Sequence, residues 1–182
     1  MSKPATTVDL AAFKKQLADS LERSAKSAGQ KIVKESLTCE IANGLQVVTA
    51  AIQRDELPTE KEITTGVDLL FGYVSIDGQR ALPPGFYRIR LALPGYTKKG
   101  DVTVTFIDAK GKSVHSLTGK GKPGLPKPGT DDATLRNYHV EVGVCSKRTK
   151  KCFYMRRVGF LDWSWGCRDA QGNEISCADN QP

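Results

Sequence analysis

The hydrophobic period of the chain changes once, and this change limits the folds that the sequence can adopt. Before residue 30, apolar side chains from Leu10 to Leu21 recur every three or four residues, which is the spacing of one face of an α-helix. From Val67 onward, apolar and polar residues alternate, which is the period of a β-strand. The sequence therefore predicts a helix followed by a β-rich region.

The predicted helix runs from about Val8 to Ala28 and is amphipathic. Thr6 and Asp9 form a capping-box pattern before it, and Gly29 is a typical helix stop. We expect this helix to pack on the rest of the chain. Binding to a partner or to a membrane surface is the alternative. Its polar face mixes both charge signs and lacks Trp, which makes the membrane role the weaker of the two.

Residues 36–53 fit two different structures. Apolar residues alternate from Leu37 to Ile41, just before Asn43 and Gly44. An Asn-Gly pair between alternating runs is the strongest short signal for a hairpin turn. The apolar residues of this segment also fit a helical period. We favour the hairpin and keep the helix as the alternative.

Residues 67–160 contain short alternating runs that are separated by turn residues such as Gly and Pro. Such runs predict an antiparallel β-sandwich. The stretch Pro-Gly-Phe-Tyr-Arg-Ile-Arg-Leu at residues 84–91 is similar to a strand of immunoglobulin-like and transthyretin-like sandwiches, which indicates a class of fold and not a family. The expected fold is α+β and mainly β. An N-terminal amphipathic helix, residues 1–30, packs on a β-rich domain, residues 31–182, with disulfide-stapled C-terminal hairpins.

Four of the five cysteines lie in the last 38 residues, at the ends of two polar, turn-like segments. Cysteines at the two ends of a hairpin loop can face each other at bridging distance. We therefore predict the disulfides Cys145–Cys152 and Cys167–Cys177, and a reduced, largely buried Cys39. Two alternatives are the pairing of Cys145 with Cys177 and Cys152 with Cys167, or four buried reduced thiols.

The spacing of these cysteines bears on metal binding and on location. Structural zinc sites use cysteines two to four residues apart, whereas the gaps here are six, fourteen and nine residues. We therefore expect no metal. The N-terminus lacks the apolar segment of a secretory signal, and no apolar run approaches the roughly 18 residues that span a bilayer. Disulfides nevertheless favour an extracytoplasmic or extracellular location, because cytosolic proteins rarely keep them.

The net charge of +7 is unevenly distributed. Lys and Arg outnumber Asp and Glu by 15 to 9 in residues 92–182, but only by 12 to 11 in residues 1–91. A basic half favours an anionic partner, such as nucleic acid, phospholipid headgroups, an acidic protein or a glycan. The alternative is that surface lysines only keep the protein soluble.

Cations and aromatic residues are most concentrated near the last four cysteines. The candidate anion-binding residues are Lys147, Arg148, Lys150, Lys151, Arg156 and Arg157. The candidate aromatic binding residues are Tyr154, Trp163 and Trp165. Cations can neutralise phosphate while aromatic rings stack on bases or sugars. The alternatives are a solvated hairpin tip for the cations and core packing for the two tryptophans.

Nothing in the sequence forms a recognisable catalytic motif. The chain has two histidines, His115 and His139, and neither lies in a motif for nucleophilic or metal-assisted catalysis. We therefore expect no enzyme activity and no cofactor, and a binding or structural module that recognises a protein, a glycan or another anionic surface. One alternative is a nucleic-acid-binding domain that uses the basic half. A second is a membrane-active or partner-binding protein that acts through its N-terminal helix.

Overall fold

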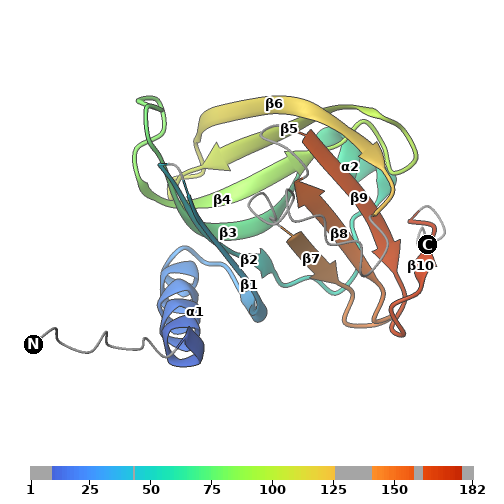
Figure 1. Cartoon of the computed structure of the whole chain (residues 1–182), viewed down its shortest axis with the longest axis horizontal. Coiled ribbons are helices and arrows are strands. Elements are labelled where there is room, and N and C mark those ends of the chain that lie inside the picture. The colour runs from blue at the N-terminus through green and yellow to red at the C-terminus, as the bar shows by residue number, and fades with distance from the viewer. Residues whose placement is uncertain (1–9, 43, 126–140, 158–161, 178–182) are drawn as a thin grey trace, which may run out of the picture.

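The structure is a computed structural model, and it describes residues 10–42, 44–125, 141–157 and 162–177 (Figure 1). The helices within these residues are α1 (Leu10–Ser27) and α2 (Glu60–Thr65). The strands are β1 (Ile32–Ala42), β2 (Leu45–Ile52), β3 (Val67–Ile76), β4 (Gly85–Ala92), β5 (Gly100–Ile107), β6 (Ser113–Pro123), β7 (Glu141–Cys145), β8 (Cys152–Arg157), β9 (Asp162–Arg168) and β10 (Glu174–Ile175). The expectation of a mainly β fold is confirmed. The predicted capping box of Thr6 and Asp9 lies outside the described residues.

The strands form one mixed sheet in the order β1-β2-β3-β4-β5-β6-β9-β8-β7, with β10 paired to β9. Neighbouring strands are antiparallel except β6 and β9, which are parallel over residues 120–123 and 162–165. The sheet curls until β7–β9 lie opposite the first strands, so that it is nearly closed into a barrel (Figure 1). A bridge between Arg54 and Ser146 links the segment after β2 to the segment after β7.

The predicted antiparallel β-sandwich is not confirmed. A sandwich consists of two separate sheets packed face to face, whereas the parallel pairing of β6 with β9 joins both halves of the chain into one sheet. Parallel neighbours need a long connection, and here that connection contains β7 and β8. Alternating side chains could not reveal this pairing, because a sandwich and a curled sheet both place every second residue in a core.

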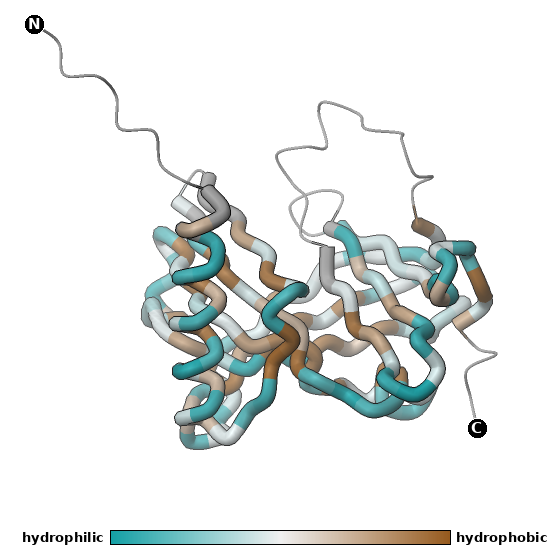
Figure 2. The backbone as a smooth tube through the Cα atoms, turned by 90° about the horizontal axis from the view of Figure 1, so that it is seen from below, coloured by the Kyte–Doolittle hydropathy of each residue, from teal (hydrophilic) through white to brown (hydrophobic). Residues whose placement is uncertain are grey.

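The main core lies inside the curled sheet, and both halves of the chain contribute to it. Leu69, Leu91 and Val102 come from β3, β4 and β5, while Phe153 and Trp165 come from β8 and β9, and all five are buried. Apolar and polar residues alternate along the strands of both halves (Figure 2). The two halves are therefore held together by one shared core.

Gly121 allows β6 and β9 to approach each other closely. A Cβ atom at this position would lie 2.5 Å from Cζ3 of Trp165 and 2.7 Å from Cγ2 of Val102. These contacts are shorter than side chains tolerate, so a larger residue would force the two strands apart. Gly121 thus fixes the position of β9, whose first residues belong to the candidate site described below.

Helix α1 covers part of the outer face of the sheet, beside β1–β3 (Figures 1 and 2). Leu21 and Ala25 are buried in a second, smaller core with Ala50 and Phe71. Partly buried apolar side chains from β1 and β2 surround this cluster. Strands β2 and β3 therefore contribute apolar side chains to both cores, on the face toward the main core and on the face toward the helix, whereas the described side chains of β1 contribute only to the second.

The ambiguous residues 36–53 lie in a hairpin of β1 and β2. The hairpin prediction is confirmed, and the helical alternative is wrong. Gly44 has φ +81°, in the left-handed region that glycine adopts more readily than other residues. The turn residues were therefore a better guide than the match to a helical period.

Candidate functional site

Both predicted disulfides are present: Cys145 bonds to Cys152, and Cys167 bonds to Cys177. Cys39 is free, as predicted, but it is exposed, so the expectation that it is buried was wrong. Its register partner in β2 is Val48, on the outer face of the sheet. Partial desolvation raises the pKa of Cys39, and the positive charge of Lys14 in α1 offsets part of this rise.

The first disulfide closes a tight loop of residues 146–151, which we call the basic loop. Its ends are joined by a backbone hydrogen bond from Ser146 N to Lys151 O at 2.9 Å, and Lys150 N donates to Ser146 O at 3.0 Å. The Ser146 hydroxyl accepts a bond from Thr149 N and donates one to Asp55 O at 2.9 Å. The basic loop is therefore held by one covalent bond and by a network around a buried serine.

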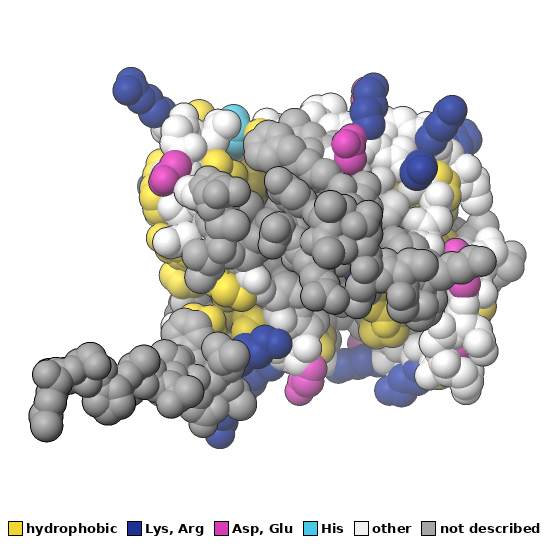
Figure 3. Space-filling model, in the orientation of Figure 1, with side chains coloured by type: hydrophobic (Ala, Val, Ile, Leu, Met, Phe, Trp, Pro, Cys, Tyr) yellow, Lys and Arg dark blue, Asp and Glu magenta, His cyan; other side chains and the backbone are white. Residues whose placement is uncertain are grey.

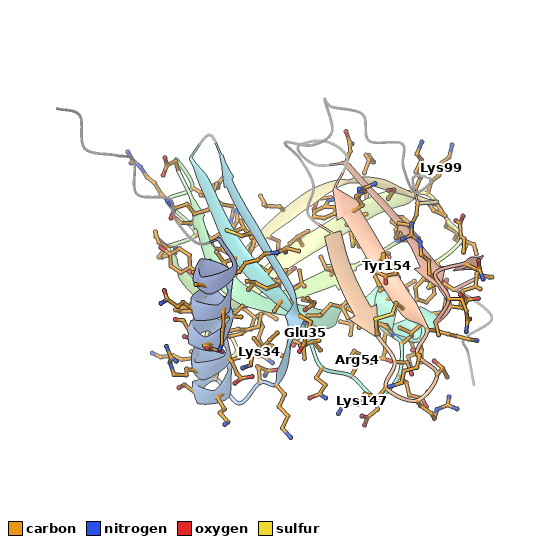
Figure 4. The ribbon with its side chains drawn as sticks, turned by 60° about the horizontal axis from the view of Figure 1, so that its bottom comes forward. Lys34, Glu35, Arg54, Lys99, Lys147 and Tyr154 are labelled. Atoms are coloured by element: carbon orange, nitrogen blue, oxygen red, sulfur yellow. A yellow bond between two sulfur atoms is a disulfide. The ribbon has the colours of Figure 1, made fainter. Side chains whose placement is uncertain are left out.

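The charges of the basic loop are only partly neutralised. Arg148 Nε lies 2.7 Å from Oε1 of Glu56. For Lys147, Lys150 and Lys151, no carboxylate among the described residues lies within the 4.0 Å that defines an ion pair here. Figure 4 shows Lys147 projecting at the end of the molecule where Arg54 also lies. Three lysines thus remain available to an anion.

The arginines of β8 do not join the basic loop. Arg156 lies in register with Ser164 and Arg157 with Trp163, at the far end of β8 from Cys152. Arg156 is four positions further along the strand than Cys152, a distance of about 13 Å. Arg156 is partly buried, and the side chain of Arg157 lies outside the described residues. The six predicted cations therefore form two separate groups.

Tyr154 does not present a free ring for stacking. The position of a Cβ at Gly143 would be 3.1 Å from Cε1 of Tyr154, so the ring covers this glycine. The guanidinium of Arg168 lies over the ring, 5.3 Å from its centroid. Sequence reasoning missed Arg168, although it lies directly opposite Cys152 in the sheet. Only the register between β8 and β9 places it beside the basic loop.

The two tryptophans occupy different environments. Trp165 is fully buried, and its Nε1 donates to Tyr96 O at 2.9 Å. Its assignment to a binding surface was therefore wrong, and the alternative of core packing holds. Trp163 is only partly buried and packs at the margin of the main core. Its Nε1 is shielded from solvent and has no hydrogen-bond partner among the residues that the structure describes.

Trp163 lines a shallow hollow of about 610 Å³, which we call the lysine hollow. Its other residues are Lys99, Gly100, Lys120, Gly121, Lys122 and Asp162. Lys120 forms an ion pair with Asp101. Lys and Arg side chains project from the molecule near its upper right edge, and Lys99 lies at the opposite end of β7–β9 from Lys147 (Figures 3 and 4). Sequence reasoning missed these lysines, because the parallel β6–β9 pairing that collects them has no sequence signal.

The described residues contain no group of three or more His, Cys, Asp or Glu side chains that could hold a metal ion. None of the helices in this part of the chain is both long enough and apolar enough to cross a membrane. Among the described residues, cations gather in the basic loop and in the lysine hollow.

Comparison of the chain with protein-family models, with curated proteins and with solved structures finds no match.

Proposed function

We propose that this protein is a non-enzymatic module that binds an anionic glycan through the basic loop. One observation carries the proposal. A disulfide-closed hairpin loop presents Lys147, Lys150 and Lys151 without a carboxylate partner among the described residues, while Glu56 holds the fourth cation, Arg148. Carboxylate or sulfate groups along a glycan chain would satisfy these ammonium groups.

The rigidity of the basic loop supports this proposal. Ordering a free loop on binding costs entropy, so a loop that is already ordered binds more tightly for the same contacts. Lys150 has φ +62° and is the only described residue other than glycine with a positive φ. Such a conformation costs on the order of 1–3 kcal/mol. A lysine at a position that favours glycine supports a role for its side chain.

A glycan fits the surroundings of the basic loop better than a nucleic acid. Single-stranded nucleic acids are bound largely by stacking of bases on aromatic rings. Among the described aromatic residues of β8 and β9, Phe153 and Trp165 are fully buried and Tyr154 is covered by Arg168. Trp163 lines the lysine hollow, at the opposite end of these strands from the basic loop. Two disulfides also favour an oxidising compartment outside the cytosol, where anionic glycans are abundant partners. Electrostatic contacts without stacking therefore favour the glycan.

The N-terminal helix is a weaker candidate for membrane or partner binding. Leu21 and Ala25, on its apolar face, are buried against Ala50 and Phe71. Binding through this face would first require the helix to leave the sheet. We therefore place binding at the basic loop and give the helix a structural role.

The proposal can be tested with three probes: heparin, single-stranded DNA and uncharged dextran. We expect heparin binding at about 0.15 M salt that weakens steeply as salt rises, because exposed charges are screened over about 8 Å under these conditions. Dextran should not bind. Tighter binding to DNA than to heparin at equal salt would overturn the choice of a glycan, and the absence of heparin binding would overturn the proposal.

Two triple variants locate the binding surface. The first replaces Lys147, Lys150 and Lys151 with glutamine, and the second replaces Lys99, Lys120 and Lys122 of the lysine hollow. Both lower the net charge from +7 by three lysines, to +4. We expect the first variant to weaken heparin binding at least about tenfold and the second to change it little. An equal loss of heparin affinity in both variants would show that the net charge of the protein determines binding and that the basic loop does not.

A further inference from the structure

A groove on the outer face of the sheet is separate from both basic surfaces. It lies between the last turn of α1, the beginning of β4 and the turn between β5 and β6. Its volume is about 560 Å³, which is within the usual range for small-molecule sites. Hydrophobic side chains are exposed on this flank of the molecule, above α1 (Figure 3).

The floor of the groove is aromatic. Phe71 and Phe86 lie in the groove with their rings stacked, 6.1 Å apart and inclined by 10°. Tyr73 packs edge-on against Phe86 at 5.6 Å. Phe86 is nevertheless 43% exposed, and it is one of only two large apolar residues exposed in the described part of the chain. An exposed ring that its neighbours hold in place offers a flat apolar surface at little entropic cost.

Both walls of the groove are fixed by hydrogen bonds that backbone N–H groups donate. On the helix side, Gly29 N donates to Lys26 O, and Gln30 N donates to Ala25 O at 2.8 Å. This is the Schellman pattern with a left-handed glycine, which satisfies the last carbonyl groups of the helix. On the other side, Asp108 Oδ1 accepts bonds from Lys110 N and Lys112 N, both at 2.9 Å.

The groove also has a cationic side. Arg88 lines it and uses Nη1 to contact Oδ2 of Asp68 at 3.1 Å. The Nη2 atom lies beside Gly111 and has no hydrogen-bond partner among the described residues. Lys110 stands exposed at the rim. Oδ1 of the nearby Asp108 accepts hydrogen bonds from its own turn, so the side-chain donors that face an incoming anion here are those of Arg88 and Lys110.

We propose that this groove binds a small aromatic anion: a flat apolar ring system that carries a carboxylate or sulfonate group. The rings would lie on the exposed ring of Phe86, which the buried Phe71 supports from behind. The acidic group would accept hydrogen bonds from Nη2 of Arg88, with Lys110 adding its charge. Stacking on Phe86 supplies apolar contact, and Arg88 favours ligands with an acidic group over neutral ligands of the same shape. This proposal does not depend on glycan binding by the basic loop.

Two fluorescent probes of similar shape test the proposal with the full chain. The first, 8-anilinonaphthalene-1-sulfonate, carries the acid, and the second, N-phenyl-1-naphthylamine, is neutral. We expect the sulfonate to bind at a single site at least about tenfold more tightly than the neutral probe, because a charged hydrogen bond is added. Amide NMR shifts on binding should centre on residues 86–88 and 107–111.

Variants on neighbouring residues separate the two parts of the site. Arg88→Gln should weaken the sulfonate about tenfold and leave the neutral probe unchanged. Arg90→Gln is the matched control, because Arg90 is on the same strand and also pairs with Asp68, yet it lies outside the groove. Phe86→Ser removes an exposed ring and should weaken both probes. Circular dichroism and the Arg90 control distinguish a lost site from a lost fold.

Three results would overturn the proposal. The first is that neither probe binds the folded protein, and the second is that the NMR shifts centre elsewhere. The third is that the Arg88 and Arg90 variants lose binding of the sulfonate equally. The last result would mean that charge near Asp68 matters and the groove does not. Unchanged heparin binding in the Phe86 and Arg88 variants would confirm that the two sites are independent.

Discussion

The sheet ends in two hairpins that are stabilised in different ways. At one end, β1 and β2 are covered by α1, and Leu21 of the helix is buried with Phe71 and Ala50 of the sheet. At the other end, Cys145–Cys152 crosslinks β7 to β8, and Cys167–Cys177 ties β9 to the segment after β10. Both hairpins lie near each other where the sheet almost closes (Figure 1). One fold thus uses apolar packing for its first edge and covalent bonds for its last.

The outer faces of the two hairpins explain this difference. The outer face of β2 and β3 carries apolar residues such as Ala50 and Phe71, which gain stability when a helix removes them from water. The outer face of β7–β9 carries Gly143, Tyr154 and Arg168. These residues offer little apolar area to bury, so a covering helix would stabilise this face much less. Disulfides stabilise it without any further apolar surface.

The largest expected effect is on the helix-covered hairpin. Leu21→Ala removes a side chain that is 2% exposed, and such changes cost about 3 kcal/mol of unfolding free energy. Because Leu21 contacts only the outer face, hydrogen exchange should speed up first in β1 and β2 and last in β8 and β9. Chemical denaturation measures the loss of unfolding free energy, and amide hydrogen exchange measures the order in which the strands lose protection. Gln16→Ala, on the exposed side of the same helix, is the control and should change neither.

Uniform loss of protection in Leu21→Ala would contradict this comparison. It would mean that α1 stabilises the whole sheet and not one edge. Faster exchange confined to β1–β3 would show that the two hairpins are separate units of local stability.

The disulfide-held hairpin should respond to the opposite treatment. The two bonds join cysteines that are 7 and 10 residues apart, and loops of this length stabilise by roughly 2–3 kcal/mol each in the chain-entropy model. The Cys145→Ser, Cys152→Ser double variant should therefore lose about this much and should exchange faster in β7 and β8. Cys39→Ser is the control, because Cys39 forms no disulfide.

This double variant also tests the proposed binding site. If order in the basic loop matters, heparin binding should weaken although all four cations of the loop remain. Binding equal to that of the wild type would show that charge alone is sufficient and that the disulfide serves stability only.

Sequence predicts best where a signal is local. Asn43 and Gly44 identified the first hairpin, and the polar segments between cysteines identified both disulfides, because a turn or a short loop is encoded by adjacent residues. The lysine hollow needed the pairing of Gly121 with Trp163, which depends on how a curled sheet meets itself. Such long-range pairing leaves no pattern along the chain.

The same limit applies to the groove and to the errors in the binding surface. In the sequence, Phe86 belongs to a stretch that predicts only a strand, and it is the position of α1 that makes this ring the floor of a groove. Strand alternation places Trp163 and Trp165 on one face, so the sequence predicts the same role for both. Alternation predicts which face of the sheet a side chain points to, but not how deeply it is buried. Trp165 is in the core, while Trp163 borders the surface.

The smallest expected effect is electrostatic and belongs to the helix-covered hairpin. Lys34 Nζ of β1 lies 3.1 Å from Oδ1 of Asp19 and 3.4 Å from Oε1 of Glu22, both on α1 (Figure 4). The hydrogen bond from Lys34, with its charge, lowers the pKa of Asp19 below 3.8. The same bond, with the charges of Asp19 and Glu22, raises the pKa of Lys34 above 10.5.

These two directions define the pH window of the contribution. The lowered pKa of Asp19 means that its share of the stability is present above pH 3.8 and is lost as the pH falls through the folded-state value. The raised pKa of Lys34 means that its share is present below pH 10.5 and is lost as the pH rises through the folded-state value. Lys34→Gln should therefore be slightly less stable than the wild type near neutral pH, and the difference should shrink at both extremes. Because all three groups are exposed, high salt should also remove the difference. A difference that persists at pH 2 or in high salt would mean that the lysine acts through the packing of its aliphatic stem on α1, and not through its charge.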